Sequence, residues 1–458
     1  MERLFVKRAL LPNGWAKSVR VNIDNEGRID SVESGVELDP ADTDLGERIL
    51  LPAQCNLHSH AFQRVMAGMT EYRTAGRDSF WTWRDLMYRF VGRITPQQIE
   101  AIAALVYMEM LECGYAAVGE FHYIHHRPSG QPYDRITETT ERIFEAANDT
   151  GIGLTHLPVL YSYGGAGEQA LKPGQIRFAN DLDQYTGLVD EARSLARRYL
   201  HRDARVGIAP HSLRATSPQQ LQSITRSFRY GPIHIHIAEQ PAEVHEVEEW
   251  LGERPVAWLL HHLEVDDSWC LVHATHMTET ETRECARSGA TAGLCPITES
   301  NLGDGIFDGA AFLEAGGRFG IGSDSNVRIS LSEELRTLEY SQRLRDKARN
   351  VLLIGEGSVG ASLYRGALQG SAQALGRESG AIQAGLFADL VALDGKDVTF
   401  DGLHGDSLLD AWIFAADDRV VTDVWSAGRH CVTGGRHVER QRIVARYRQE
   451  TRALLESL

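Results

Sequence analysis

The chain lacks several features that mark particular classes of protein. It has no apolar run of about 18 residues, the length of a membrane-spanning helix, and its first residues contain no long apolar core of a secretory signal. The six cysteines form no C-x-x-C pair, which indicates neither a zinc knuckle nor a disulfide framework. Internal repeats and low-complexity segments are also absent. We therefore expect a soluble, cytoplasmic protein whose cysteines are mostly reduced and buried.

The chain also has fewer basic than acidic residues. The chain has 63 acidic against 47 basic residues and a formal net charge of −16, which argues against nucleic acid or an anionic membrane as its main partner. A small anionic substrate remains compatible, because a few arginines can reverse the field inside one pocket. The length of 458 residues and the apolar content of 43% suit a barrel-sized domain with a smaller module.

The two ends of the chain share a β-rich pattern. Residues 1–50 contain short alternating runs separated by turn signals at 12–14 and 25–27. Similar runs with glycines follow residue 376, before a helical stretch over 441–458. Isolated two-stranded ribbons are only marginally stable. One small β-sandwich formed from residues 1–50 and 376–458, closed by that helix, is therefore favoured over two separate ribbons.

The middle of the chain, residues 51–375, alternates between strand-like and helix-like segments. Amphipathic stretches begin after Thr95 and Ser217, which are residue types preferred at helix N-caps. Eight such alternations predict a (β/α)8 barrel of the α/β class, with catalytic residues at the carboxyl ends of its strands. The apolar runs span residues 50–60, 115–121, 151–161, 204–211, 232–239, 269–275, 291–297 and 318–324.

Metal-ligand residue types fall at the ends of these runs. His58 and His60 lie two residues apart, so on a strand both imidazoles point to one face. With His236 and Asp324 they provide three imidazoles and one carboxylate, a set that suits Zn²⁺ and also accepts Fe²⁺ or Mn²⁺. Two histidines alone are often unrelated, but the shared position at run ends favours a metal-dependent hydrolase. His234 lies further from its run's end, and we expect it to pack.

Two more residues suit proton transfer. Glu239 is the last residue of the fifth run and lies just past the expected strand end, where a carboxylate can exchange protons with the attacking water; the alternative is an ordinary acid at a helix start. His273 ends the sixth run and can orient that water. Some barrels bridge two metals with a carbamylated lysine, but none of the five lysines lies in a predicted barrel strand. Glu120 is another possible bridge, and a single metal is the simpler interpretation.

These segments resemble the amidohydrolase superfamily, in its mononuclear deaminase branch. The likeness covers essentially the whole chain, from LLPAQCNLHSHAF through HIAE, LVHATH and GSDSN to GAIQAGLFADLVALD. The resemblance implies that the first two histidines, the HIAE histidine and the late aspartate bind one divalent metal. It also implies that Glu239, His273 and Asp324 handle protons.

A closer resemblance, to formimidoylglutamate deiminases, rests on HSHAFQRVMAG, SFWTWRDLMYRF, VGEFHYIHH, APHSLRAT and SDSNVRISLSEELRTLEYSQRLR. It implies hydrolysis of N-formimino-L-glutamate to N-formyl-L-glutamate and ammonia in histidine degradation, by a homodimer. Arginines suit the two carboxylates of that small anionic amidine. Asn326 departs from the histidine of some members, which should affect the surroundings of the metal more than the reaction class. The positions that match the family's substrate contacts are Gln63, Arg84, Tyr123, His211 and Arg214.

The sequence leaves alternatives open. Deaminases of N-guanidino acids or purine-type rings share this core, and N-formimino-aspartate differs by one methylene, worth about 1–3 kcal/mol in a pocket. An aromatic substrate would need stacking residues, which Trp81 and Trp83 could supply, although both also suit packing. A non-catalytic binding protein on the same fold would be expected to lack some ligands, and none is missing here.

Overall fold

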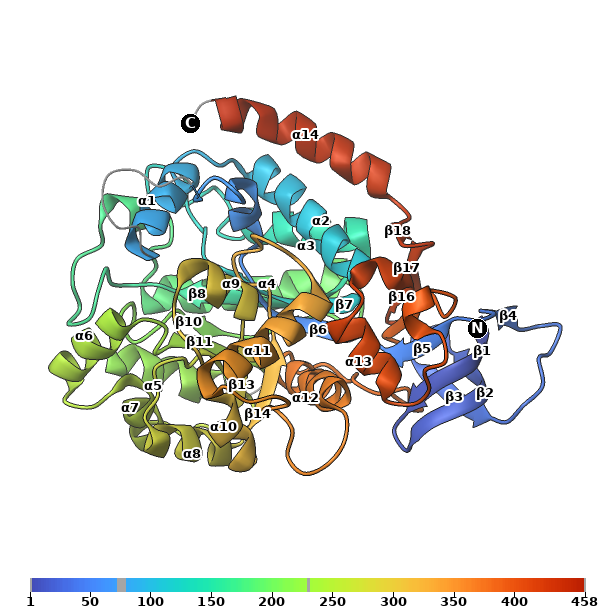
Figure 1. The fold of residues 1–458 in the computed structure, drawn as a ribbon. Helices are drawn as coiled ribbons and strands as arrows, with labels where there is room; N and C mark the ends of the chain where they lie inside the picture. The colour runs from blue at the N-terminus through green and yellow to red at the C-terminus, as the bar shows by residue number, and fades with distance from the viewer. Residues whose placement is uncertain (1, 72–79, 229–230, 457–458) are drawn as a thin grey trace.

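The computed structural model describes residues 2–71, 80–228 and 231–456. Figure 1 shows a body of strands and helices with a small β-rich module at one side, where the first strands of the chain lie near the last. The chain is thus of mixed α/β architecture, as expected. Among the described helices, none combines the length and the apolar character needed to cross a membrane.

The body contains two sheets of parallel strands. Each of the eight predicted runs contains at least one strand, and the fourth run contains two short ones separated by Gly207 and Ile208. The first sheet has β6 (Gln54–Ser59), β7 (Tyr115–His122), β8 (Gly153–Leu160), β9 (Arg205–Val206) and β10 (Ala209–Pro210). The second has β11 (Ile233–Ile237), β12 (Trp269–His273), β13 (Thr291–Leu294) and β14 (Arg318–Ile321).

The edges of these two sheets are joined on both sides. Ser59 at the end of β6 forms a parallel bridge with Asp324 after β14, and Ile208 forms one with Ile233 of β11. The backbone N–H of Asp324 donates to the carbonyl of His58 at 2.9 Å, and that of Ile208 to Pro232 at 2.9 Å. The carboxyl ends of β6 and β14 therefore lie side by side although they are far apart in the sequence.

Helices connect the strands, and their starts follow the capping rules. Thr95 and Ser217, expected as N-caps, each accept a backbone N–H and form a capping box. The helices of the body are α1 (Phe80–Val91), α2 (Pro96–Glu112), α3 (Glu138–Thr150), α4 (Leu182–Tyr199), α5 (Pro218–Ser227), α6 (Pro241–Leu251), α7 (Pro255–His262), α8 (Glu279–Ser288), α9 (Pro296–Leu302), α10 (Gly309–Glu314), α11 (Leu331–Asp346) and α12 (Val359–Ala374), with 3-10 turns η1 (Ala61–Met66) and η2 (Pro173–Gln175).

An apolar cluster fills the interior of the body at one end of its strands. Leu57 and Val272 pack there against Ala374, the last residue of α12, and against Leu375, which follows it. The Thr155 hydroxyl donates to the carbonyl of Leu375, and an imidazole nitrogen of His234 donates to that of Ala374. His234 is therefore a packed residue, as predicted. The end of α12 therefore closes this end of the strands, opposite their carboxyl ends.

Both ends of the chain contribute to the small module. Its strands form one nine-stranded sheet, in which β5 pairs with β1 in parallel and with β15 in antiparallel orientation. These pairings join the strands into one sheet, where the expected sandwich has two. The strands are β1 (Glu2–Leu11), β2 (Gly14–Ile23), β3 (Ile29–Ser34), β4 (Thr43–Asp44), β5 (Ile49–Pro52), β15 (Leu390–Leu393), β16 (Val421–Ser426), β17 (Arg429–Thr433) and β18 (Arg436–His437).

Alternate residues along the strands of this sheet pack into two different apolar cores. Leu50, Leu390 and Trp425 pack with β1 and β2 in a core of the module itself, whereas Leu51 and Val391 pack into the main core of the body. This alternation follows from the two-residue period of a strand. The predicted boundary at residue 50 falls inside β5, and the division into 1–50, 51–375 and 376–458 stays a prediction.

The last helices attach to the body. Helix α14 (Arg440–Glu456) lies along α2 in Figure 1, where Gln98 donates to the carbonyl of Glu450 at 3.0 Å. It corresponds to the expected closing helix, whose residues 457–458 lie outside the described range. Helix α13 (Ser407–Phe414) and the 3-10 turns η3 (Val398–Phe400) and η4 (Asp418–Val420) complete the C-terminal part. All six cysteines are free, and five of them are buried.

Candidate active site

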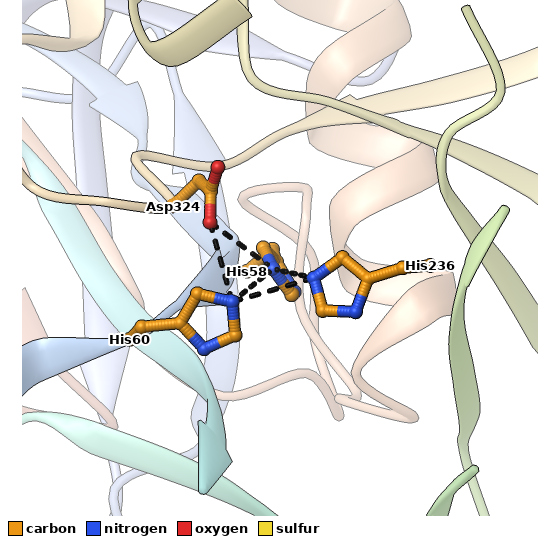
Figure 2. Close-up of side chains that lie close together, drawn as sticks. All are labelled: His58, His60, His236 and Asp324. Carbon is orange, nitrogen blue, oxygen red and sulfur yellow. Dashed lines mark hydrogen bonds and ion pairs between the residues drawn. The ribbon is translucent and has the colours of Figure 1, made fainter. Parts of the chain in front are cut away.

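Four predicted metal ligands meet at the carboxyl ends of the strands. His58 lies on β6 and His60 directly follows it, while His236 lies on β11 and Asp324 follows β14. Figure 2 shows their side chains pointing toward one another. The three Nε2 atoms lie 3.1–3.3 Å apart, and Asp324 Oδ1 is 3.5 Å from His58 Nε2 and 3.3 Å from His60 Nε2. The sequence prediction of this cluster is therefore confirmed as a spatial group that could hold a metal ion.

The donor set fits a divalent metal ion. Zinc holds histidine nitrogens at about 2.0–2.1 Å, so nitrogens that lie 3.1–3.3 Å from one another could all reach one ion. The Nδ1 atoms of His60 and His236 face the carbonyls of Phe121 and His211 at 3.0 and 3.2 Å. A carbonyl only accepts, so each Nδ1 carries the proton and each Nε2 presents its lone pair inward. Burial lowers the pKa of His58 to about 3, which keeps that ring neutral as well.

The loop that carries Asp324 is held in an unusual conformation. Asp324 and Asn326 have φ values of 45° and 55°, in the left-handed region. The Asn326 amide nitrogen contacts Ser59 Oγ at 3.1 Å and the carbonyl of Asp324 at 3.0 Å, and its oxygen accepts from Ser323 Oγ. Asparagine tolerates this backbone region better than most residues. The departure at Asn326 therefore fastens the loop of Asp324 to the end of β6.

Glu239 and His273 lie beside the histidine cluster. His273 Nε2 is 3.9 Å from Glu239 Oε1 and 3.9 Å from Asp324 Oδ2, so one nitrogen faces both carboxylates. His273 Nδ1 lies 3.2 Å from Oε1 of Glu299, a residue in α9. Arg214 Nη2 lies 3.8 Å from the other oxygen of Glu239. All of these side chains are largely buried, so their charges interact with little screening by solvent.

The burial of these groups sets their proton affinities. Burial raises the pKa of Glu239 to about 7, although His273 and Arg214 oppose the shift. Burial disfavours the charged ring of His273, but the carboxylates of Glu239, Glu299 and Asp324 outweigh it and raise the pKa of His273 to about 10. Burial also opposes the charge of Asp324, yet the imidazoles around it hold its pKa below the usual range. A carboxyl with a pKa near neutrality suits acid–base catalysis.

A small cavity opens above the cluster, and every predicted substrate-contact position lines it. Gln63 Nε2 donates to the Tyr123 hydroxyl at 2.9 Å, and His211 is packed edge-on to Tyr161. Arg84 comes from α1, where its guanidinium lies 5.6 Å from the ring centre of Tyr88. The residues lining the cavity are His60, Gln63, Trp83, Arg84, Met87, Tyr88, Tyr123, Tyr161, Phe178, His211, Arg214, His236, Glu239, His273, Leu302 and Asp324.

Sequence reasoning missed part of this environment. Glu299 in CPITESN and the ring-lined wall formed by Tyr88, Tyr161 and Phe178 were not anticipated. The position of Glu299, an acidic residue two positions past the end of the seventh run, was a usable signal. No comparable signal exists for the wall, whose members come from separate connections. Trp83 lines the cavity, whereas the side chain of Trp81 lies outside the described residues.

Glu120, the other residue suggested as a bridge to a second metal, instead binds a backbone group. Glu120 Oε1 accepts the backbone N–H of Ala61 at 2.8 Å. Glu120 belongs to neither of the groups of possible metal ligands found among the described residues. Burial raises the pKa of Glu120 to about 8, so its neutral form is favoured at neutral pH. These contacts favour one metal over two.

The chain belongs to the amidohydrolase family, whose model matches residues 49–431. A second model, for the N-terminal domain of formimidoylglutamate deiminase HutF, matches residues 1–45. The chain is 48% identical to a formimidoylglutamate deiminase of Pseudomonas aeruginosa, with 100% of both chains covered. A crystal structure of an amidohydrolase from Brucella melitensis has a TM-score of 0.95 and 46% identity, over 99% of this chain and 100% of that one. Both resemblances seen in the sequence are thereby confirmed.

A more distant relative is named for a different activity. A 5-methylthioadenosine/S-adenosylhomocysteine deaminase of Natronomonas pharaonis is 27% identical, over 79% of this chain and 78% of its own. An adenosine deaminase structure from Xanthomonas campestris, with a TM-score of 0.81 and 22% identity, covers 100% of this chain and 98% of that one and shows the shared fold alone. The N-terminal match and the higher identity separate this chain from that group.

Proposed function

We propose that this protein hydrolyses the C=N bond of N-formimino-L-glutamate, giving N-formyl-L-glutamate and ammonia, as a step of histidine degradation. One observation carries the assignment: two arginines, Arg84 and Arg214, line the same cavity as the His/Asp cluster. A substrate with two carboxylates next to a hydrolysable amidine needs this combination. The full-length identity with a formimidoylglutamate deiminase supports the same substrate.

The cluster is proposed to bind one divalent metal, with zinc favoured over Fe²⁺ or Mn²⁺ because three neutral imidazoles and a carboxylate suit it. The ligands are His58, His60, His236 and Asp324. We further infer that the two parallel sheets, joined at both edges, form one closed (β/α)8 barrel. The family resemblance supports a homodimer working in the cytoplasm.

When bound, the metal supplies Lewis acidity that makes hydroxide available near neutral pH. The chain's own residues carry out the proton transfers. Asp324 Oδ2 accepts a proton from the attacking water, assisted by His273, as the C–O bond forms at the formimino carbon. Glu239, held between His273 and Arg214, delivers a proton to the imine nitrogen. The proton held by Asp324 then passes to the amino group of the tetrahedral intermediate. The hydroxyl group of the intermediate returns a proton to Glu239 as the carbonyl forms, and the C–N bond breaks to release ammonia.

The substrate-contact residues are proposed to orient this reaction. Arg84 and Arg214 pair with the two carboxylates, while Gln63, Tyr123 and His211 complete the wall. Gln63 Oε1 is buried and has no hydrogen-bond partner among the described residues, so it can accept from the substrate. An N-guanidino acid is the second candidate substrate, because it offers a similar head group; a purine ring would leave both arginines without carboxylates.

Ammonia release from N-formimino-L-glutamate is the direct test. Zinc-loaded protein is expected to release ammonia, and a chelated sample should lose this activity and regain it when zinc is restored, because the bound metal would supply the Lewis acidity that makes hydroxide available near neutral pH. Ammonia is measured by a coupled assay and metal by elemental analysis. Absence of release from protein that contains one metal per chain would contradict the substrate and point to N-guanidino acids.

Replacement of Arg84 tests the carboxylate contact. Arg84→Met is expected to lower kcat/KM for N-formimino-L-glutamate by about 10- to 100-fold, mainly through KM, because a buried charged hydrogen bond is worth about 1.5–3 kcal/mol. Arg89→Met, an exposed position on the same helix, is the control and should keep normal kinetics. A formamidine without carboxylates should react equally with both variants; an equal loss on both substrates would refute the contact.

A further inference from the structure

We infer that Glu299 is a positioning residue, which fixes the ring of His273 so that its Nε2 faces the reacting groups. This inference deepens the proposed function and rests on it for the role of His273. Glu299 is buried, with 6% of its surface exposed. Its Oε1 lies 3.2 Å from His273 Nδ1 and also accepts the backbone N–H of Cys295 at 2.9 Å.

The contact decides which nitrogen of His273 faces the reacting groups. An ionised carboxylate only accepts, so Nδ1 must donate to Glu299. Nε2 is then the atom that faces Glu239 and Asp324, 3.9 Å from each. A partner on the second nitrogen commonly sets the tautomer and the orientation of a catalytic imidazole. Without Glu299, Nδ1 would lose the acceptor that distinguishes it from Nε2, so the ring could present either nitrogen.

The backbone around His273 makes such a partner necessary. His273 and Ala274 have φ values of 69° and 49°, a left-handed region that costs non-glycine residues free energy. The chain therefore bends at the end of β12, and the backbone at His273 departs from a regular strand. Glu299 is itself restrained by the N–H of Cys295, where α9 begins, so it provides a fixed acceptor for His273 Nδ1.

A second buried glutamate, Glu334, offers a control that distinguishes positioning of His273 from general stabilisation of the fold. Glu334 is also buried and accepts the backbone N–H of Ile297 at 2.9 Å, next to the start of the same helix. It does not line the cavity and has no hydrogen bond or ion pair with His273 among those found in the described residues. Glu334→Gln is therefore the matched control for Glu299→Gln: both replace one buried carboxyl group by an amide of nearly the same shape, and only Glu299→Gln removes the charge from the acceptor of the His273 Nδ1 proton.

The experiment is a double-mutant cycle. Glu299→Gln and Glu334→Gln are made alone and with His273→Asn, chosen because asparagine tolerates the left-handed backbone. Glu299→Gln is expected to lower kcat by about 100-fold with KM and metal content unchanged. In the His273→Asn background it should cost less than about twofold more, because its partner is already gone. Glu334→Gln should leave kcat within about twofold of wild type.

Two outcomes overturn the inference. Either Glu299→Gln keeps kcat within about threefold of wild type, or it loses the same factor with and without His273, as a purely structural residue would. A second readout needs no substrate: the downfield NMR signal of the His273 Nδ1 proton, assigned by its loss in His273→Asn, should move in Glu299→Gln and stay in Glu334→Gln. An inactive wild type in which this signal still responds would refute the proposed reaction while retaining the positioning role.

Discussion

Replacing Glu239 by glutamine is expected to lower kcat for ammonia release by about 1,000-fold, within the range that a general acid–base group contributes. The amide has the shape of the carboxyl group but cannot deliver a proton to the imine nitrogen. Burial raises the pKa of Glu239 to about 7, so the native residue is well matched to both accept and release a proton near neutrality. The measurement is steady-state ammonia release by purified variant and wild type.

The metal should remain in this variant. Glu239 is not part of the group His58, His60, His236 and Asp324, so metal per chain is expected to equal that of wild type. Glu334→Gln is the matched control, since that glutamate is buried near the same strand ends and lies outside the cavity. A Glu239→Gln enzyme that retains more than about a tenth of the wild-type kcat would show that another group donates the proton.

Replacing Arg377 by methionine is expected to destabilise the protein by about 3–5 kcal/mol, the cost of removing one partner from a buried ion pair. Arg377 is 5% exposed and forms two hydrogen bonds with Asp389, at 2.6 and 2.9 Å. It also lies 3.0 Å from Asp203, which Arg429 of β17 contacts through both oxygens. The variant leaves two buried carboxylates with one arginine. Chemical denaturation of metal-loaded protein measures the change.

An exposed ion pair provides the comparison. Arg283→Met removes the partner of Glu279 on α8, where both side chains are more than half exposed. That change should cost less than about 0.5 kcal/mol, because solvent screens exposed pairs. If Arg377→Met shifted the denaturation midpoint no more than Arg283→Met, the buried network would not contribute the expected stability.

Acid should weaken the same network in the wild type. Burial opposes the charge of Asp203, but Arg377 and Arg429 hold its pKa well below the usual range. An unfolded aspartate titrates near about 3.9. A lowered folded pKa contributes stability that is present above this value and is lost as the pH falls below it. The difference in stability between wild type and Arg377→Met is therefore expected to shrink from pH 7 toward pH 3.

The order of strands was predictable because it depends on local pattern. Each of the eight apolar runs contains a strand, and the His-x-His pair at 58–60 lies at the end of the first. The caps at Thr95 and Ser217 were also correct, since a capping box needs only residues three apart. The sandwich expected for the small module is one sheet, because pairing partners between distant strands do not follow from the alternation that marks them as strands.

By itself the sequence determined the residue types of the site and their positions at strand ends, because hydrophobic period and spacing are local properties. Only the tertiary structure decided that His58 and His236, 178 residues apart, bring their nitrogens to 3.1 Å. It also decided that Glu299 contacts His273 and that Arg214 lies beside Glu239. The physical reason is that such contacts depend on how the sheets join and bend, which the sum of long-range packing fixes and no short segment specifies.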